Sequence, residues 1–217
     1  MKTKIIASTL FTVMLAACSS SKDANNGNFE KALNAHFAKD CITIQPFLMA
    51  ADGRSYPMTV ELQQKNNFTT QAQVDQNNAN ATQPVDVLVK AGVLSVSDGT
   101  KKVKPMFGTG EMTVPTKVYT LTDVGKKAIV SADGTAMCVG HYKVDEIVRF
   151  TQPNNALGQT ISDVSFTVSP VDLPDWVKSA DVQKVYGLGN KLAEHSKATR
   201  TVLLASDGWI DASDFSR

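Results

Sequence analysis

Hydrophobic and polar positions alternate most regularly between residues 136 and 151, which predicts one long strand or two bent ones. Side chains of a strand point alternately to its two faces. The face expected to pack into the core carries Tyr142, Val144, Val148 and Phe150. The opposite face carries Lys143, Asp145 and Arg149. A second alternating run, Val164, Phe166 and Val168, predicts an antiparallel partner for this strand.

Near the start of the chain, apolar residues recur at helical spacing and predict a helix with one apolar face. That face comprises Phe29, Ala32, Leu33, His36 and Phe37. Asn28 is its expected N-cap. Because His36 lies among apolar side chains, we expect a core residue that makes a hydrogen bond, and not a ligand. Residues 173–186 predict a later helix, with Asp172 as its cap.

Shorter apolar runs predict further strands at 41–49, 58–62, 199–205 and 209–210. Pro46 indicates that the first of these strands bends or lies at a sheet edge, since proline cannot donate a hydrogen bond to a neighbouring strand. Asp-Gly pairs, which favour turns, begin at residues 52, 98, 133 and 207. Their uneven spacing indicates no internal repeat.

The middle of the chain passes from polar to apolar sequence. Residues 63–83 are rich in Gln, Asn and Thr, which predicts a short helix at 71–76 followed by a loose loop. Thr82 is the expected N-cap of a second helix, with Pro84 in its first turn and Gly92 at its end.

A hairpin is expected after this second helix. Its predicted parts are a strand at 93–97, a turn at Asp98-Gly99, an outgoing arm at 101–111 and a further strand at 117–121. Thr122 is then the expected N-cap of a short helix that runs through residue 129.

Two strings in this region are similar to winged-helix domains of bacterial regulators. They are Leu88-Val89-Lys90-Ala91-Gly92-Val93-Leu94 and Tyr119-Thr120-Leu121-Thr122-Asp123-Val124-Gly125-Lys126-Lys127. The resemblance covers residues 82–130 and implies a winged-helix-like shape. A helix that reads DNA is basic, whereas this helix offers Lys90 against Asp86. The expected fold is α+β, with a winged-helix-like helical and hairpin segment packed with a small antiparallel sheet and no nucleic-acid partner.

The N-terminus has the order of a secretory signal. Lys2 and Lys4 precede an apolar run at 5–16, which is too short to span about 30 Å of hydrocarbon as a helix. The string Leu15-Ala16-Ala17-Cys18 resembles the lipobox of bacterial lipoproteins. The resemblance implies that the signal peptide 1–17 is removed, that the Cys18 thiol is lipidated, and that the new N-terminus receives an acyl chain such as palmitate.

The lipobox also implies a location. In lipoproteins an aspartate after the lipidated cysteine favours the inner membrane, and this chain has Ser19, so the resemblance implies a lipid anchor in the outer membrane with the protein on the periplasmic face. The polar stretch 18–28 cannot bury enough surface to order itself and is expected to be a flexible tether. The body is then a single α+β unit at 29–217, winged-helix-like at 82–130 and mainly antiparallel β at 134–217.

The charge of the chain bears on its possible partners, and its cysteines bear on the compartment. The whole chain has a net charge of +1, and without Lys2 and Lys4 it has 20 basic against 21 acidic residues, which offers no attraction for nucleic acid. Cys41 and Cys138 are left once Cys18 is lipidated, and in an oxidising compartment two cysteines favour one disulfide. Two buried thiols remain the alternative.

The sequence lacks the residue patterns of common catalytic and metal sites, apart from Ser19-x-x-Lys22, which matches the β-lactamase spacing by letters only and lies in the expected tether. It has no Gly-x-Ser-x-Gly, Gly-Lys-Ser/Thr or His-Glu-x-x-His string, and His36, His141 and His195 stand singly. His141 and Asp145 share a predicted strand face, but about 13 Å would separate their backbones. We therefore expect no catalytic residues, no cofactor and no metal site.

The expected function is that of a non-enzymatic binding or adaptor module of the cell envelope, which reaches the membrane through its lipid and works with another envelope protein. The alternative is a periplasmic hydrolase or cell-wall remodelling enzyme. It predicts a deep polar cleft that collects two or more of five side chains, which are His36, His141, His195, Asp145 and Glu146.

Overall fold

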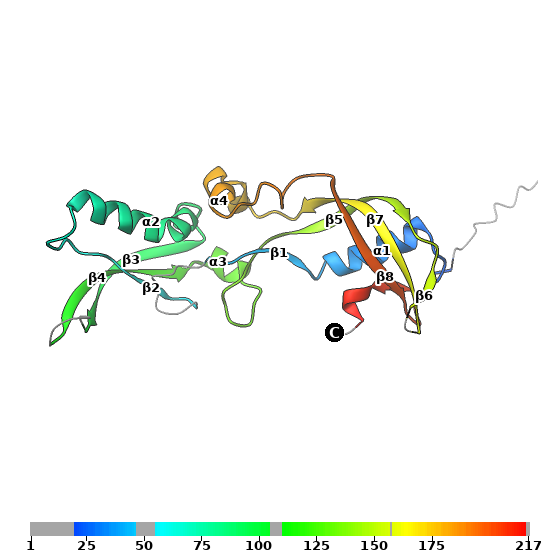
Figure 1. Ribbon diagram of the computed structural model, residues 1–217, viewed down its shortest axis with the longest axis horizontal. Coiled ribbons are helices and arrows are strands. Elements are labelled where there is room, and N and C mark those ends of the chain that lie inside the picture. Colours follow the sequence, from blue (N-terminus) through cyan, green and yellow to red (C-terminus); the bar gives the residue numbers. More distant parts are fainter. Residues whose placement is uncertain (1–19, 47–54, 105–109, 157, 216–217) are drawn as a thin grey trace, which may run out of the picture.

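The molecule is elongated and consists of two antiparallel sheets with helices packed on them (Figure 1). The computed structural model describes residues 20–46, 55–104, 110–156 and 158–215. The α+β class expected from the sequence is confirmed. The turn predicted at residue 52 and the lipidation site Cys18 lie outside the described residues.

The larger sheet has six strands and curls around helix α1 (Asn26–Phe37) (Figure 1). In spatial order its strands are β1 (Cys41–Ile44), β5 (Met137–Phe150), β7 (Gln159–Val171), β8 (Ser196–Leu204) and β9 (Trp209–Asp211), with β6 (Asn154–Ala156) paired to β7. The predicted edge position of the first strand is confirmed, and so is the antiparallel pairing of β5 with β7.

Helix α1 forms because an asparagine caps it and an apolar face recurs along it. The cap is Asn25, whose side-chain oxygen accepts a hydrogen bond from the Asn28 N–H at 2.9 Å, so the prediction of Asn28 as the cap is wrong. The predicted apolar face is confirmed, since Phe29, Ala32, Leu33, His36 and Phe37 are all buried. The Phe29 ring makes edge-to-face contacts with Phe150 and Trp209, at centroid distances of 4.8 and 4.9 Å.

Residues 20–25 pack against the body of the molecule. The Asn28 side chain donates hydrogen bonds to the carbonyl oxygens of Ser20 and Asp23, both at 2.8 Å. The Trp209 indole donates to the carbonyl oxygen of Lys22 at 3.1 Å. The prediction of a flexible tether is therefore wrong for residues 20–28, because residues 26–28 belong to α1 and side-chain donors from α1 and β9 hold the backbone of the residues before it.

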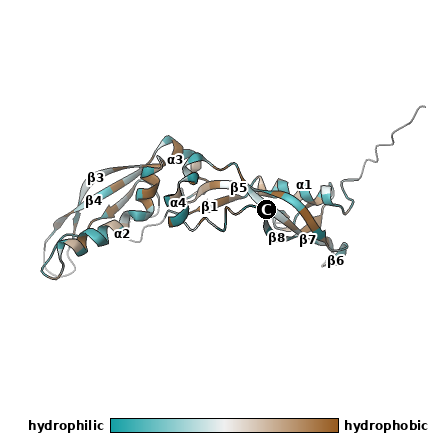
Figure 2. Cartoon of the chain, turned by 90° about the horizontal axis from the view of Figure 1, so that it is seen from above, coloured by the Kyte–Doolittle hydropathy of each residue, from teal (hydrophilic) through white to brown (hydrophobic). Residues whose placement is uncertain are grey.

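The smaller sheet lies at the other end of the molecule, beneath a long helix (Figure 1). In spatial order its strands are β2 (Met58–Glu61), β4 (Met112–Leu121) and β3 (Leu94–Val103). Helix α2 (Gln71–Lys90) is tied to this sheet by the Tyr119 hydroxyl, which donates to the Asp86 carboxylate at 2.8 Å. Figure 2 shows that the first half of α2 is mostly hydrophilic and that its apolar residues gather toward its C-terminal end.

Helix α2 is one continuous helix, which corrects the prediction of a short helix, a loop and a second helix. Thr70 caps it: its hydroxyl accepts from the Gln73 N–H at 3.2 Å, and the Gln73 side chain accepts from the Thr70 N–H at 2.8 Å. Thr82 is therefore not a cap but lies inside the helix, where its hydroxyl donates to the Asn78 carbonyl at 3.1 Å. Side-chain hydrogen bonds between residues four positions apart support the polar first half.

Strand β3 continues through Asp98-Gly99, so the turn predicted there is wrong. Gly99 pairs with Thr116 of β4, and a Cβ at Gly99 would lie 2.9 Å from the Thr116 hydroxyl oxygen. This glycine therefore permits close approach of two strands. Residues 101–103 belong to β3 as well, which corrects their assignment to the outgoing arm at 101–111.

Two β-bulges in β5 interrupt the predicted alternation between Val144 and Arg149, whereas Phe150 packs against the core around α1 as predicted. Between Val144 and Glu146, and again between Ile147 and Arg149, β5 advances by two residues while β7 advances by one. Each bulge adds one residue and reverses the face that the following side chains take. Val144 is buried as predicted, but Val148, expected in the core, is 56% exposed. Ile147 is only 5% exposed, although strict alternation would place it on the solvent face with Asp145 and Arg149.

Strand β5 takes part in both hydrophobic cores. Met137 and Val139 pack in the core beneath α2, whereas Val144 and Ile147 pack in the core around α1. The core beneath α2 also contains residues of two short helices, η1 (Asp175–Lys178) and α4 (Ala180–Val185).

These two short helices replace the single helix predicted at 173–186. Asp172, its expected cap, has a φ of +56° and caps neither helix.

Several other predicted elements are confirmed. Thr122 caps α3 (Asp123–Ala128), and Gly92, with a φ of +75°, follows the end of α2. Strands β2, β8 and β9 lie where apolar runs predicted them, and a short helix η2 (Ala212–Asp214) follows β9. Among the described residues, no helix combines the length and the hydropathy needed to cross a bilayer.

Candidate functional site

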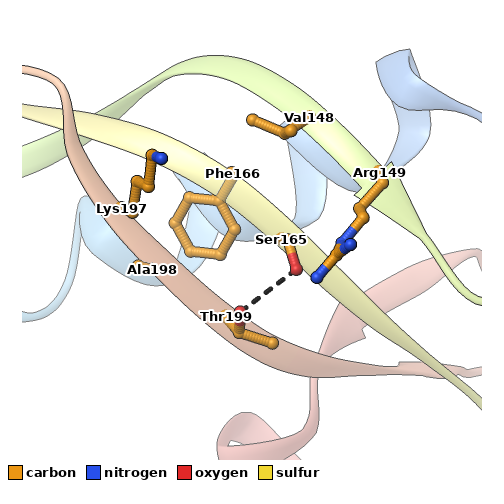
Figure 3. A pocket seen from close by; sticks show the side chains of 7 residues that line it. All are labelled: Val148, Arg149, Ser165, Phe166, Lys197, Ala198 and Thr199. Carbon is orange, nitrogen blue, oxygen red and sulfur yellow. Dashed lines mark hydrogen bonds between the residues drawn. The ribbon is translucent and has the colours of Figure 1, made fainter.

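An open groove of about 440 Å³ lies across three strands of the larger sheet (Figure 3). Its lining residues come from β5, β7 and β8, and they are Val148, Arg149, Ser165, Phe166, Lys197, Ala198 and Thr199. Ser165 and Thr199 are partners in the β7–β8 register, and their hydroxyl oxygens are 3.1 Å apart. Alternation along β7 places Val164 and Phe166 in the core around α1, so the intervening Ser165 lies on the outer face of the sheet.

The two bulges of β5 shape this groove. After the first bulge Ile147 faces the core and Val148 faces outward, and the second bulge leaves Arg149 on the outer side as well, paired with Ser165 of β7. Without the extra residue of the first bulge, the alternation would bury Val148 and leave this part of the groove without an apolar wall. The sequence reasoning missed the groove because nothing in a single sequence marks the position of a bulge.

Two cations line the groove, Arg149 from β5 and Lys197 from β8 (Figure 3). Neither forms an ion pair with another residue that the structure describes. A guanidinium can bind a carboxylate through two parallel hydrogen bonds, and an ammonium adds a second positive charge. With two hydroxyls and the exposed Val148 beside them, this arrangement suits an extended chain that carries carboxylates.

The predicted disulfide is confirmed. The sulfur atoms of Cys41 and Cys138 are 2.09 Å apart, and the two Cα atoms are 5.4 Å apart. Cys41 lies in β1 opposite His141 of β5, and the His141 Nε2 atom is 3.3 Å from the Cys41 sulfur. The expectation that His141 stands alone is therefore wrong.

Gly140 brings Cys138 and His141 to the same cysteine. Residues three apart on a regular strand point to opposite faces. Gly140 has a φ of +144°, which L side chains rarely adopt, and a Cβ there would lie 2.8 Å from the Val171 carbonyl oxygen. This glycine breaks the alternation, and both Cys138 and His141 then contact Cys41. The string Cys138-Val139-Gly140-His141 is the sequence signal for this arrangement, because a glycine between the two ligand residues can break the alternation.

A hollow of about 300 Å³ adjoins the disulfide on the Cys138 side. Gly140, Asp172 and Trp176 also line it, so Cys138 borders a space that solvent can enter. Among the described residues, Cys41, Cys138 and His141 form the group whose ligand atoms all lie within 4.8 Å of one another. In this group the two cysteines are joined as a disulfide.

His195 and Asp145 come together, although neither joins His141. The His195 Nδ1 atom is 3.1 Å from an Asp145 carboxylate oxygen, and the Ser169 hydroxyl donates to the same oxygen at 2.9 Å. A hydroxyl nucleophile would bond to the free nitrogen of the histidine, which Ser169 does not do. The His195 side chain is 73% exposed.

His36 is a buried core residue with a hydrogen bond, as predicted. Its Nδ1 atom is 3.1 Å from the Asp214 carboxylate, and its Nε2 atom is 3.8 Å from that of Asp40. Glu146 is exposed, opposite Thr167 of β7. His36, His141 and His195 thus contact different partners, and none of them lines the groove in Figure 3.

Comparisons with known proteins provide no relative. No protein family, curated protein or solved structure matches the chain.

Proposed function

We propose that the chain is a non-enzymatic lipoprotein of the cell envelope, anchored through Cys18 in the outer membrane and facing the periplasm, and that it acts as a binding or adaptor module. The observation that carries the proposal is the string Leu15-Ala16-Ala17-Cys18 at the end of a short apolar run. The Cys41–Cys138 disulfide supports it, because such bonds persist in oxidising compartments such as the periplasm.

The groove lined by Arg149 and Lys197 is the proposed contact for an acidic segment of an envelope protein. Two cations without ion-pair partners among the described residues attract carboxylates, and paired hydroxyls can accept or donate hydrogen bonds. An open groove also suits a peptide segment better than a small molecule, which is usually buried on most sides.

The shape of the molecule fits an anchored adaptor. Helix α1 begins at the end of the molecule farthest from α2 (Figure 1), so the chain enters the body at the end that bears the larger sheet. The groove then lies in the half nearer the proposed anchor, and the smaller sheet extends away from it.

The winged-helix-like shape of residues 82–130 is part of the proposal as a scaffold for protein contacts. Helix α2, the β3–β4 hairpin and α3 follow one another in the order that the resemblance implies. Lysines of the hairpin face acidic side chains: Lys101 is 2.8 Å from Glu61, and Lys102 is 3.6 Å from Glu111. Such pairing weakens the attraction for nucleic acid.

Acylation of Cys18 tests the anchor. The wild-type chain and a Cys18→Ala variant are expressed with a palmitate analogue, fractionated, and their N-terminal peptides are weighed by mass spectrometry. We expect a diacylated, N-acylated Cys18 in the outer-membrane fraction for the wild type, and loss of both label and membrane association for Cys18→Ala. An unmodified Cys18 in a wild-type protein recovered without membrane would contradict the proposal.

A further inference from the structure

We propose that Cys41, Cys138 and His141 bind a zinc ion when the disulfide between the two cysteines is reduced. The ligand atoms of the three side chains already lie within 4.8 Å of one another. Thiolate sulfur and imidazole nitrogen are the ligands that zinc prefers in proteins. The proposal is independent of the lipid anchor and of the groove.

The distance between His141 and Cys41 fits a shared zinc ion. Zinc bonds sulfur at about 2.3 Å and nitrogen at about 2.0 Å, so two such ligands of a tetrahedral ion lie about 3.5 Å apart. The His141 Nε2 atom is 3.3 Å from the Cys41 sulfur. The main change that binding requires is in the two bonded sulfurs, which must separate to about 3.8 Å on one ion.

The backbone holds the three residues in place without the disulfide. Cys41 and His141 face each other across the hydrogen-bonded pair of β1 and β5. Cys138 belongs to the same strand as His141, and Gly140 between them sets their relative direction through its φ of +144°. Ligands on paired strands of a sheet lose little conformational freedom when a metal binds.

The hollow beside Cys138 provides access to the metal. It has a volume of about 300 Å³, so a zinc ion and a water molecule can reach the sulfur from this side. Three protein ligands leave the fourth tetrahedral position to water or to a ligand in the hollow, as in open zinc sites.

The reaction requires a dithiol reductant, which supplies two electrons. Its two S–H groups become a disulfide, the Cys41–Cys138 bond breaks, and each released sulfur takes one proton. Zinc then displaces these two protons and binds both thiolates and the neutral His141 imidazole. The metal joins β1 to β5 at the point where the disulfide joined them, so the crosslink between the two strands is kept in the reduced protein.

Zinc binding to the full chain carrying Cys18→Ser, in which Cys41 and Cys138 are the only thiols, tests the proposal. The oxidised and the reduced protein are titrated with Zn²⁺ against a chromophoric chelator, and Co²⁺ is added to the reduced form to detect thiolate-to-metal absorption. We expect one zinc per reduced chain and none per oxidised chain. His141→Gln should weaken binding at least tenfold, while His195→Gln, the matched control, leaves it unchanged.

Equal binding by the oxidised and reduced forms, no binding by the reduced form, or an unchanged affinity in His141→Gln would each overturn the proposal. Should reduction unfold the chain, circular dichroism during the zinc titration decides the matter. Recovery of the folded spectrum by the parent protein but not by His141→Gln supports the site, and failure of both to recover contradicts it.

Discussion

At Gly125 of α3, even the smallest added group should destabilise the protein. A Cβ there would lie 2.3 Å from the Val93 carbonyl oxygen and 3.0 Å from a methyl group of Leu121. In an open helix, glycine to alanine stabilises by about 1 kcal/mol. Here the backbone oxygen cannot move aside, so we expect Gly125→Ala to destabilise the protein by about 1 to 3 kcal/mol in chemical denaturation.

Gly189 provides the control for this substitution. No atom lies within 4 Å of a Cβ placed there, and its φ is outside the range that disfavours L side chains. We expect Gly189→Ala to change the free energy of unfolding by less than about 0.5 kcal/mol. Equal effects of the two substitutions would show that α3 does not approach Val93 as closely as described.

The four tyrosines should resist ionisation in the folded protein. Burial raises the pKa of Tyr56, Tyr119, Tyr142 and Tyr186 above the ordinary value, and for Tyr119 the Asp86 carboxylate raises the pKa further. An unfolded chain loses these protons near pH 10 while the folded chain keeps them, so the free energy of unfolding falls as the pH rises above about 10.

Ultraviolet absorbance of tyrosinate measures this difference. At pH 10 we expect far less than half of the tyrosine to be ionised in the folded protein, and about half in the same protein in urea. Coincident titration curves for the two forms, while circular dichroism still reports folded protein, would be incompatible with the burial of these side chains.

At the scale of single elements, β5 should show a reversal of core and surface. Ile147 is 5% exposed and Val148 is 56% exposed, because the bulge between Val144 and Glu146 shifts the alternation by one residue. We expect Ile147→Ala to destabilise by about 2 to 5 kcal/mol and Val148→Ala by less than about 0.5 kcal/mol. Urea denaturation of both variants distinguishes this from a regular strand, for which the larger loss would fall on Val148.

The local sequence pattern predicted an element correctly where one periodicity of apolar residues continues along the whole element. It predicted the apolar face of α1, the alternation of β7 and the cap of α3 at Thr122. It failed where pairing across the sheet decides the geometry. The bulges of β5 depend on its register with β7. The role of Gly99 depends on Thr116, which lies against it on the neighbouring strand and is distant in sequence.

The candidate sites show the same division. Cysteine number and the proposed compartment predicted the Cys41–Cys138 disulfide, because pairing of two cysteines needs no geometry. The contact of His141 with Cys41 was missed, since strict alternation separates Cys138 from His141 and only the φ of Gly140 brings them together. The groove was missed because Arg149 and Lys197 lie 48 residues apart in sequence and meet only through β7.

At the scale of the whole molecule, the disulfide joins the two ends of a long segment of the chain, residues 41–138. Between Cys41 and Cys138 the chain forms the smaller sheet, α2 and α3 before it returns to pair β5 with β1. The closed loop spans a sequence separation of 97, for which chain entropy predicts a stabilisation of about 4 to 5 kcal/mol.

Removing this crosslink should therefore affect stability strongly. We expect Cys138→Ser to lose a large part of those about 4 to 5 kcal/mol in urea denaturation with a chelator present. Wild type measured with a dithiol reductant and the same chelator should show a similar loss. An unchanged unfolding midpoint in both cases would mean that the packing beneath α2 stabilises the segment 41–138 without help from the disulfide.

The central claim, an anchored module that holds an envelope protein through its groove, is tested most directly by crosslinking in living cells. Four forms are compared at equal yield: wild type, Cys18→Ala, the pair Arg149→Glu and Lys197→Glu, and a control pair Lys65→Glu and Lys90→Glu on the far half of the molecule. We expect wild type and the control pair to capture the same envelope protein, and the other two forms to lose it. Capture of that protein by all four forms, or of no protein by wild type, would contradict the account.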